Sequence, residues 1–132
     1  SVITYKHRGE EYMADIQMGS SEKCFAEMIW ENEPITAVDL AKMAEERFQW
    51  KKTTTYTVLK RLCNKGIFEN KSGLVMSTLS KEEYHSIHSQ NYVGDHFKGS
   101  LPAFLAAFTR GKGLSPDEYD EIRSIIDTAK EE

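Results

Sequence analysis

Cysteine and proline are scarce in this 132-residue chain, and long apolar runs are absent. The two cysteines, Cys24 and Cys63, lie far apart and form no CxxC pair, so the sequence predicts neither a disulfide framework nor a zinc knuckle. The longest mostly apolar run, LPAFLAAF from Leu101, is too short to span a bilayer, and no signal pattern opens the chain. We therefore expect a cytoplasmic protein with reduced cysteines and no membrane partner.

Motifs for catalysis are also missing. The sequence contains no GxSxG, no HExxH and no phosphate-cradling glycine loop; Gly111 and Gly113 precede a helical pattern but lack the strand of a dinucleotide fingerprint. Carboxylates that are adjacent in sequence diverge on a helix and so form no acid-base pair. We expect no enzyme and no cofactor.

Positive charge is scarce overall but concentrated in one segment. The chain carries 17 basic and 21 acidic residues, for a formal net charge of −4. Seven of the basic residues lie between Arg47 and Lys71, where Glu69 is the only acid, so this segment carries +6 and the remainder −10. A localised basic surface on an acidic protein is the asymmetry that phosphate binding requires.

Hydrophobic periodicity predicts mostly helices. After Gly66 the period changes, and IFEN and LVMSTL, joined by KSG, predict a β-hairpin. Thr36, Ser80 and Ser115 are expected N-caps, and Gly66 suits the left-handed position that ends a helix. The expected helices cover residues 20–31, 37–48, 53–65, 80–97 and 101–109, with a last helix after Ser115.

Three short helices followed by a hairpin is the order of a winged helix. The expected fold is therefore mainly α with a small β-hairpin wing: a winged helix-turn-helix over residues 19–79, then a C-terminal helical dimerisation region over 80–132. Residues 1–18 alternate in hydrophobicity around Arg8-Gly9, which suits a short hairpin or a loose arm.

The segment WKKTTTYTVLKRL, Trp50 to Leu62, has four threonines among its thirteen residues although β-branched residues are weak helix formers. The helical phase turns Thr55, Val58, Leu59 and Leu62 inward, and a buried Thr55 hydroxyl should bond to a carbonyl one turn earlier.

The outward face of this helix is rich in hydroxyls and basic residues. Short hydroxyls let a backbone approach a duplex and bond to phosphates or base edges, and Arg61 is long enough for a bidentate guanine contact. A solvated amphipathic helix with an incidental basic face is the plainer interpretation; the helix-helix-helix-hairpin order favours DNA. The expected DNA contacts are Lys51, Lys52, Thr53, Thr54, Tyr56, Thr57, Lys60, Arg61 and Lys71.

The C-terminal helices carry apolar stripes that a compact winged helix, with its own core closed, would leave exposed. The economical solution is that two copies bury these stripes against each other in a symmetric dimer. The expected interface residues are Tyr92, Phe97, Leu101, Phe104, Leu105, Phe108, Tyr119, Ile122, Ile125 and Ile126.

Histidines suggest a weaker possibility. His85 and His88 lie three apart on a predicted helix, with Glu82 and His96 nearby, and such a pair can share a metal. No third ligand is fixed by the spacing, so we expect no metal site. Protein interaction, or ligand or metal sensing by a winged helix whose main partner is not DNA, stays open as the alternative function.

Four segments, in a fixed order, carry a resemblance to a known family. They are AEMIWENEPITAVDLAKM from Ala26, FQWKKTTTYTVLKRLCNKGIFE from Phe48, SKEEY from Ser80, and KGSLPAFLAAFTRGKGLSPDEYDEI from Lys98. Over about residues 19–128 the chain resembles the penicillinase repressor family, which includes the methicillin-resistance repressors and the copper-responsive operon repressors. The resemblance implies a homodimeric winged-helix repressor that binds a palindromic operator in double-stranded DNA.

The chain departs from this family at specific positions. In family members that control β-lactam resistance, a sensor-linked protease cuts before a phenylalanine that lines up with Phe108, but Ala107 stands where Asn is typical, which argues against cleavage at this bond. The chain ends in DTAKEE without the CxC motifs of the copper-responsive members. Leu74 replaces the basic residue usual after the wing glycine, which implies weaker wing contacts with DNA.

Overall fold

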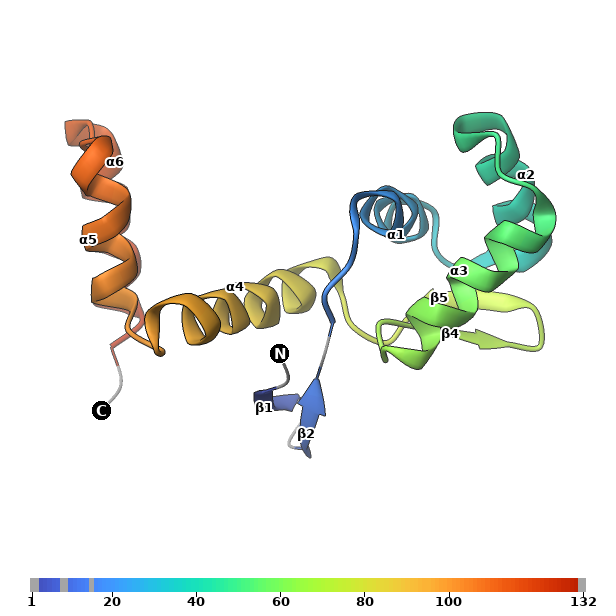
Figure 1. The fold of residues 1–132 in the computed structure, drawn as a ribbon, viewed down its shortest axis with the longest axis horizontal. Helices are drawn as coiled ribbons and strands as arrows, with labels where there is room; N and C mark the ends of the chain where they lie inside the picture. Colours follow the sequence, from blue (N-terminus) through green and yellow to red (C-terminus); the bar gives the residue numbers. More distant parts are fainter. Residues whose placement is uncertain (1–2, 8–9, 15, 131–132) are drawn as a thin grey trace. The chain divides into compact units, whose positions relative to one another are not determined.

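The computed structural model describes residues 3–7, 10–14 and 16–130, with side chains from residue 16 onward. The chain divides into two compact units, Ser1–Tyr92 and Val93–Glu132. Figure 1 shows the helices and strands of the chain, coloured along the sequence. The domain limits expected from the sequence, after residues 18 and 79, stay predictions.

An antiparallel hairpin opens the described chain. Strand β1 (Ile3–His7) pairs with β2 (Glu10–Ala14), with Ile3 opposite Ala14. The structure therefore has the hairpin and not the loose arm, although the expected turn at Arg8-Gly9 lies outside the described residues.

Local capping signals set the limits of the first two helices. Helix α1 (Ser20–Asn32) buries Phe25, Ala26, Met28 and Ile29 and ends before Pro34. Helix α2 (Ala37–Phe48) has the predicted bounds, because the Thr36 hydroxyl accepts a hydrogen bond from the Asp39 N–H at 3.1 Å.

Helix α3 (Lys52–Asn64) begins one residue earlier than predicted and buries the four predicted residues, Thr55, Val58, Leu59 and Leu62. It ends as expected near Gly66, which has a φ of +81°. The inward face of α3 is therefore confirmed.

The wing is a three-stranded antiparallel sheet in the order β3-β5-β4. Strands β4 (Phe68–Lys71) and β5 (Leu74–Ser77) form the predicted hairpin, and their turn places Ser72 and Gly73 at positive φ, 52° and 92°. The third strand, β3 (Ile35–Thr36), was not predicted, because two residues after a proline, the second of them the N-cap of α2, carry no periodicity. The Glu33 carboxylate fixes the base of the wing by accepting from the N–H and the hydroxyl of Ser77, both at 2.8 Å.

An aromatic cluster joins the wing to α1 and to helix α4 (Lys81–Phe97). The Trp30 ring lies 5.2 Å from that of Phe68 and 5.5 Å from that of Tyr84, and its indole N–H donates to the Leu79 carbonyl at 3.0 Å. The predicted Ser80 capping box is confirmed: the Ser80 hydroxyl accepts from the Glu83 N–H, and the Glu83 carboxylate accepts from the Ser80 N–H. These contacts close the core of the first unit.

The second unit contains helices α5 (Leu101–Gly111) and α6 (Pro116–Thr128), capped by the Ser100 and Ser115 hydroxyls. The prediction ended α5 two residues too early, at Thr109. No residue of either helix is buried. No helix among the residues with described structure is long and apolar enough to cross a membrane.

Candidate nucleic-acid interface

The outer face of α3 presents hydroxyls. Thr53, Thr54 and Thr57 are all exposed, and the Thr57 hydroxyl donates to the Thr53 carbonyl at 2.9 Å. That bond keeps the Thr57 oxygen lone pairs and its methyl group available to a partner. Tyr56 is half-buried against the core, and the Lys52 ammonium lies 5.9 Å from the centre of its ring.

Three lysines that precede Arg61 make this surface electropositive. Lys51, Lys52 and Lys60 are exposed, and none forms an ion pair with any residue whose side chain is described. No side chain caps the first turn of α3, so its N–H groups add partial positive charge there. Phosphate oxygens would complement both features.

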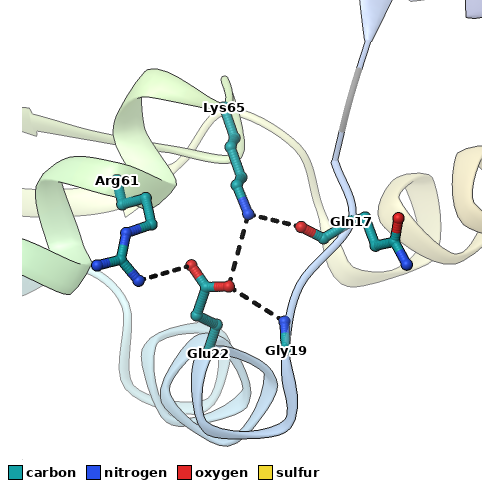
Figure 2. A network of polar contacts seen from close by, with 5 residues as sticks. All are labelled: Gln17, Gly19, Glu22, Arg61 and Lys65. Carbon is teal, nitrogen blue, oxygen red and sulfur yellow. Dashed lines mark hydrogen bonds and ion pairs between the residues drawn. The ribbon is translucent and has the colours of Figure 1, made fainter. Parts of the chain in front are cut away.

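The C-terminal end of α3 differs, because its cations are already paired (Figure 2). Arg61 Nη1 lies 3.6 Å from Oε2 of Glu22, and Lys65 Nζ lies 3.5 Å from Oε1 of the same carboxylate. Lys65 also donates to the Gln17 carbonyl. Arg61 thus has a partner within the chain, and its DNA contact stays a prediction.

The Glu22 carboxylate is ionised in this setting. Burial disfavours its charge, but the Gly19 N–H, Lys65 and Arg61 together outweigh that effect and hold the pKa of Glu22 below its usual 4.5. The Gly19 N–H donates to Glu22 Oε1 at 3.1 Å, which also caps α1. Glu22 was not identified from the sequence, since its cationic partners lie about forty residues further along the chain.

One expectation about α3 is wrong. Thr55 is fully buried as predicted, but its hydroxyl oxygen has no hydrogen-bond partner among the described residues. The threonine that bonds back to a carbonyl one turn earlier is the exposed Thr57. Helical phase determines which side chain is buried, whereas the rotamer that reaches a carbonyl depends on the packing around it.

The wing presents few free charges. Lys71 Nζ is 3.6 Å from Glu69 Oε1. Leu74, which replaces the basic residue usual in the family pattern, is exposed. The Asn70 side chain accepts from the Gly73 N–H at 3.0 Å and so fixes the turn. The wing is well ordered by hydrogen bonds but offers little net positive charge.

The predicted dimer residues are largely exposed. Phe97, Phe104, Leu105 and Ile122 are half-buried, and the Phe97 and Phe104 rings meet edge to face at 5.6 Å. The remainder present their apolar side chains to solvent in the single chain: Tyr92, Leu101, Phe108, Tyr119, Ile125 and Ile126.

Histidine geometry gives no metal centre. Among the described residues, no group of three or more His, Cys, Asp or Glu side chains is placed to hold a metal ion. The His88 ring stacks on Tyr84 at 5.6 Å with an interplanar angle of 10°. Burial, followed by the nearby charges of Lys23 and His85, lowers the pKa of His88 below 6.5, so its neutral form is favoured.

Three helices, a paired wing and an exposed hydroxyl-rich third helix define a winged-helix protein, here with a helical C-terminal extension. The penicillinase repressor family model matches residues 18–128. The chain belongs to the penicillinase repressor family, a family of transcriptional repressors and not of enzymes. The resemblance seen in the sequence is confirmed.

The individual relatives have low sequence identity to this chain, but the matches extend over most of each relative's length. The methicillin resistance regulatory protein MecI of Staphylococcus aureus (strain Mu50 / ATCC 700699) is 25% identical over 114 residues, covering 83% of this chain and 93% of that protein. The penicillinase repressor of Bacillus licheniformis is 24% identical over 118 residues, covering 86% and 92%. The MecI protein of Mammaliicoccus sciuri is 24% identical over 114 residues, covering 83% and 93%.

Proposed function

We propose that this repressor binds an inverted-repeat operator in double-stranded DNA as a homodimer, with α3 as the recognition helix. The observation that carries the proposal is the outer face of α3, where exposed threonines lie together with lysines that have no ion pair among the described side chains, on a helix whose inner face is fixed in the core. Threonines suit base edges and phosphates, and lysines supply the counterion-releasing contacts.

Dimerisation is supported by the apolar side chains of α5 and α6. A single chain would leave Phe108, Ile125 and their neighbours in water, whereas a second copy offers a self-complementary cover. Two linked recognition helices also bind much more tightly than one, so weakening the dimer would release the operator.

Cleavage by a partner sensor protease would be one route to release, although Ala107, which stands where the family typically has Asn, argues against cutting at this bond. Ala107 and Phe108 lie inside α5 and both are exposed. Proteases bind extended chains, so α5 must open before this bond is cut. Incubation with the protease of a β-lactam-sensing system, followed by mass spectrometry, tests the point: intact chain excludes this route.

The DNA proposal is tested by selecting duplexes from a random-sequence library with the full chain and measuring binding by fluorescence anisotropy. Thr57→Ala should weaken binding to selected duplexes by ~1–3 kcal/mol and relax sequence preference, whereas Lys60→Ala should weaken binding to all duplexes and flatten the salt dependence. Lys112→Ala, an exposed lysine outside α3, is the matched control. Failure of the wild-type chain to enrich any sequence contradicts the proposal.

A further inference from the structure

Glu22 lies between the two cations at the C-terminal end of α3 (Figure 2). Its side chain is only 14% exposed, and it contacts Lys65 and Arg61 with different oxygens. Lys65 is held twice, by Glu22 and by the Gln17 carbonyl. Arg61 is held more loosely, at 3.6 Å and with 54% of its side chain exposed.

This arrangement divides the positive charge of the basic segment into two groups. Lys51, Lys52 and Lys60 have no ion pair among the described side chains, whereas Arg61 and Lys65 face an ionised carboxylate. Glu22 lies beside one nitrogen of the Arg61 guanidinium, so a phosphate that approaches this cation meets the repulsion of the carboxylate. Glu22 therefore competes with phosphate for that guanidinium.

We propose that Glu22 limits the sequence-independent affinity of the DNA-binding surface, acting through Arg61. The inference rests on the proposed function. Cations that meet phosphates strengthen binding to every sequence equally, so withholding Arg61 lowers the affinity for operator and for non-specific DNA by the same factor. The Glu22 carboxylate therefore sets how strongly this surface binds any duplex and how steeply that binding depends on salt.

Glu22→Gln is the informative variant, because it removes the charge and keeps the cap. A glutamine at this position still accepts from the Gly19 N–H. The freed Arg61 should then reach a phosphate. We expect the salt slope of binding to a shuffled duplex to steepen by about 0.9 per protomer, which is roughly a fivefold gain in non-specific affinity at 0.15 M salt.

Glu31→Gln is the matched control. It makes the same chemical change on the same helix, about 14 Å further along the axis from Glu22. It should leave the salt slope and the affinity for the shuffled duplex unchanged. Any general effect of net charge would appear equally in both variants.

Arg61→Gln identifies the residue through which Glu22 acts. Alone, it should change the salt slope little, because the neighbouring Glu22 carboxylate already offsets the charge of the guanidinium. Combined with Glu22→Gln, it should return the steepened slope to the wild-type value. Thermal unfolding of each variant, monitored by circular dichroism, verifies that the fold is retained.

The outcomes separate this inference from the proposed function. If the wild-type chain prefers no sequence, the proposed function fails. If it prefers selected over shuffled duplexes, but Glu22→Gln leaves the salt slope and the affinity for the shuffled duplex unchanged, only the role of Glu22 fails. The role also fails if Arg61→Gln alone lowers operator affinity tenfold and relaxes selection at one base pair, because Arg61 then reads DNA directly.

Discussion

Residues 16–92 enclose most of their large apolar side chains, whereas residues 93–130 leave many of theirs in water. Phe25 in α1 is 0% exposed, but Phe108 in α5 is 50% and Ile125 in α6 is 65% exposed. Both regions have amphipathic helices, so the difference lies in what covers them. The winged helix has α1, α2, α3, the sheet and the start of α4 around one core, while α5 and α6 bury no residue. One region closes its core within a single chain, and the other leaves an apolar face that the proposed dimer would cover.

The largest effect is expected where the core is closed. Phe25→Ala should lower the free energy of unfolding by about 3–5 kcal/mol, since it removes a fully buried ring and leaves a cavity. Urea denaturation at fixed protein concentration measures the loss. Lys23→Ala, exposed on the same helix, should change stability by less than about 0.5 kcal/mol. Equal losses of stability for both variants would contradict the inference that Phe25 lies in a closed core.

Ile125→Glu should act on the dimer and leave the winged-helix core intact. A charge placed in the apolar face of α6 should weaken dimerisation by about 2 kcal/mol or more, or roughly thirtyfold. Sedimentation equilibrium measures the dissociation constant. Asp120→Asn, on the polar side of α6, should leave it unchanged. An unchanged constant for Ile125→Glu would mean that this face is not the dimer interface.

Thr55→Val tests whether the buried Thr55 hydroxyl in the core of the winged helix lacks a hydrogen-bond partner. The buried hydroxyl has no partner among the described residues, so removing it at constant shape should raise the free energy of unfolding by about 1–2 kcal/mol. Thr57→Val, exposed on the same helix, is the control and should be near neutral. Destabilisation by Thr55→Val would show that the hydroxyl is bonded.

The smallest expected effect is the pH dependence from His88. Because its pKa is lower when folded, the unfolded chain binds more protons, and stability falls as the pH drops below 6.5 toward the folded value. His88→Phe can keep the ring stacked on Tyr84 but cannot titrate, so it should flatten this slope. Unfolding midpoints measured between pH 7.5 and about pH 5 test the sign. A variant with the wild-type slope contradicts it.

Much of the fold was predictable because its signals are local. The bounds of α2 follow from the Thr36 cap, and the start of α4 follows from the Ser80 capping box. The inward face of α3 follows from helical phase alone. The wing hairpin follows from Ser72-Gly73, which adopts the positive φ angles of a tight turn. Each of these signals involves residues that are close to one another in the sequence.

The rest depended on residues far apart in the chain. Strand β3 exists because Ile35 pairs with Val75 across forty positions. The DNA contact expected of Arg61 stays a prediction. The ion pair that Arg61 forms with Glu22 was not predicted, because Glu22 lies in a different helix. No sequence pattern connects them.

The sequence by itself determined the order of the helices and the wing hairpin, the basic third helix and the apolar stripes of the C-terminal helices, because periodicity, capping and composition are properties of short segments. Only the tertiary structure decided which of the basic residues have an ion-pair partner among the described side chains. Packing α1 against α3 brings the Glu22 carboxylate to Arg61 and Lys65, and it leaves Lys51, Lys52 and Lys60 exposed. The physical reason is that ion pairing depends on distance in space, which a linear sequence of charges does not specify.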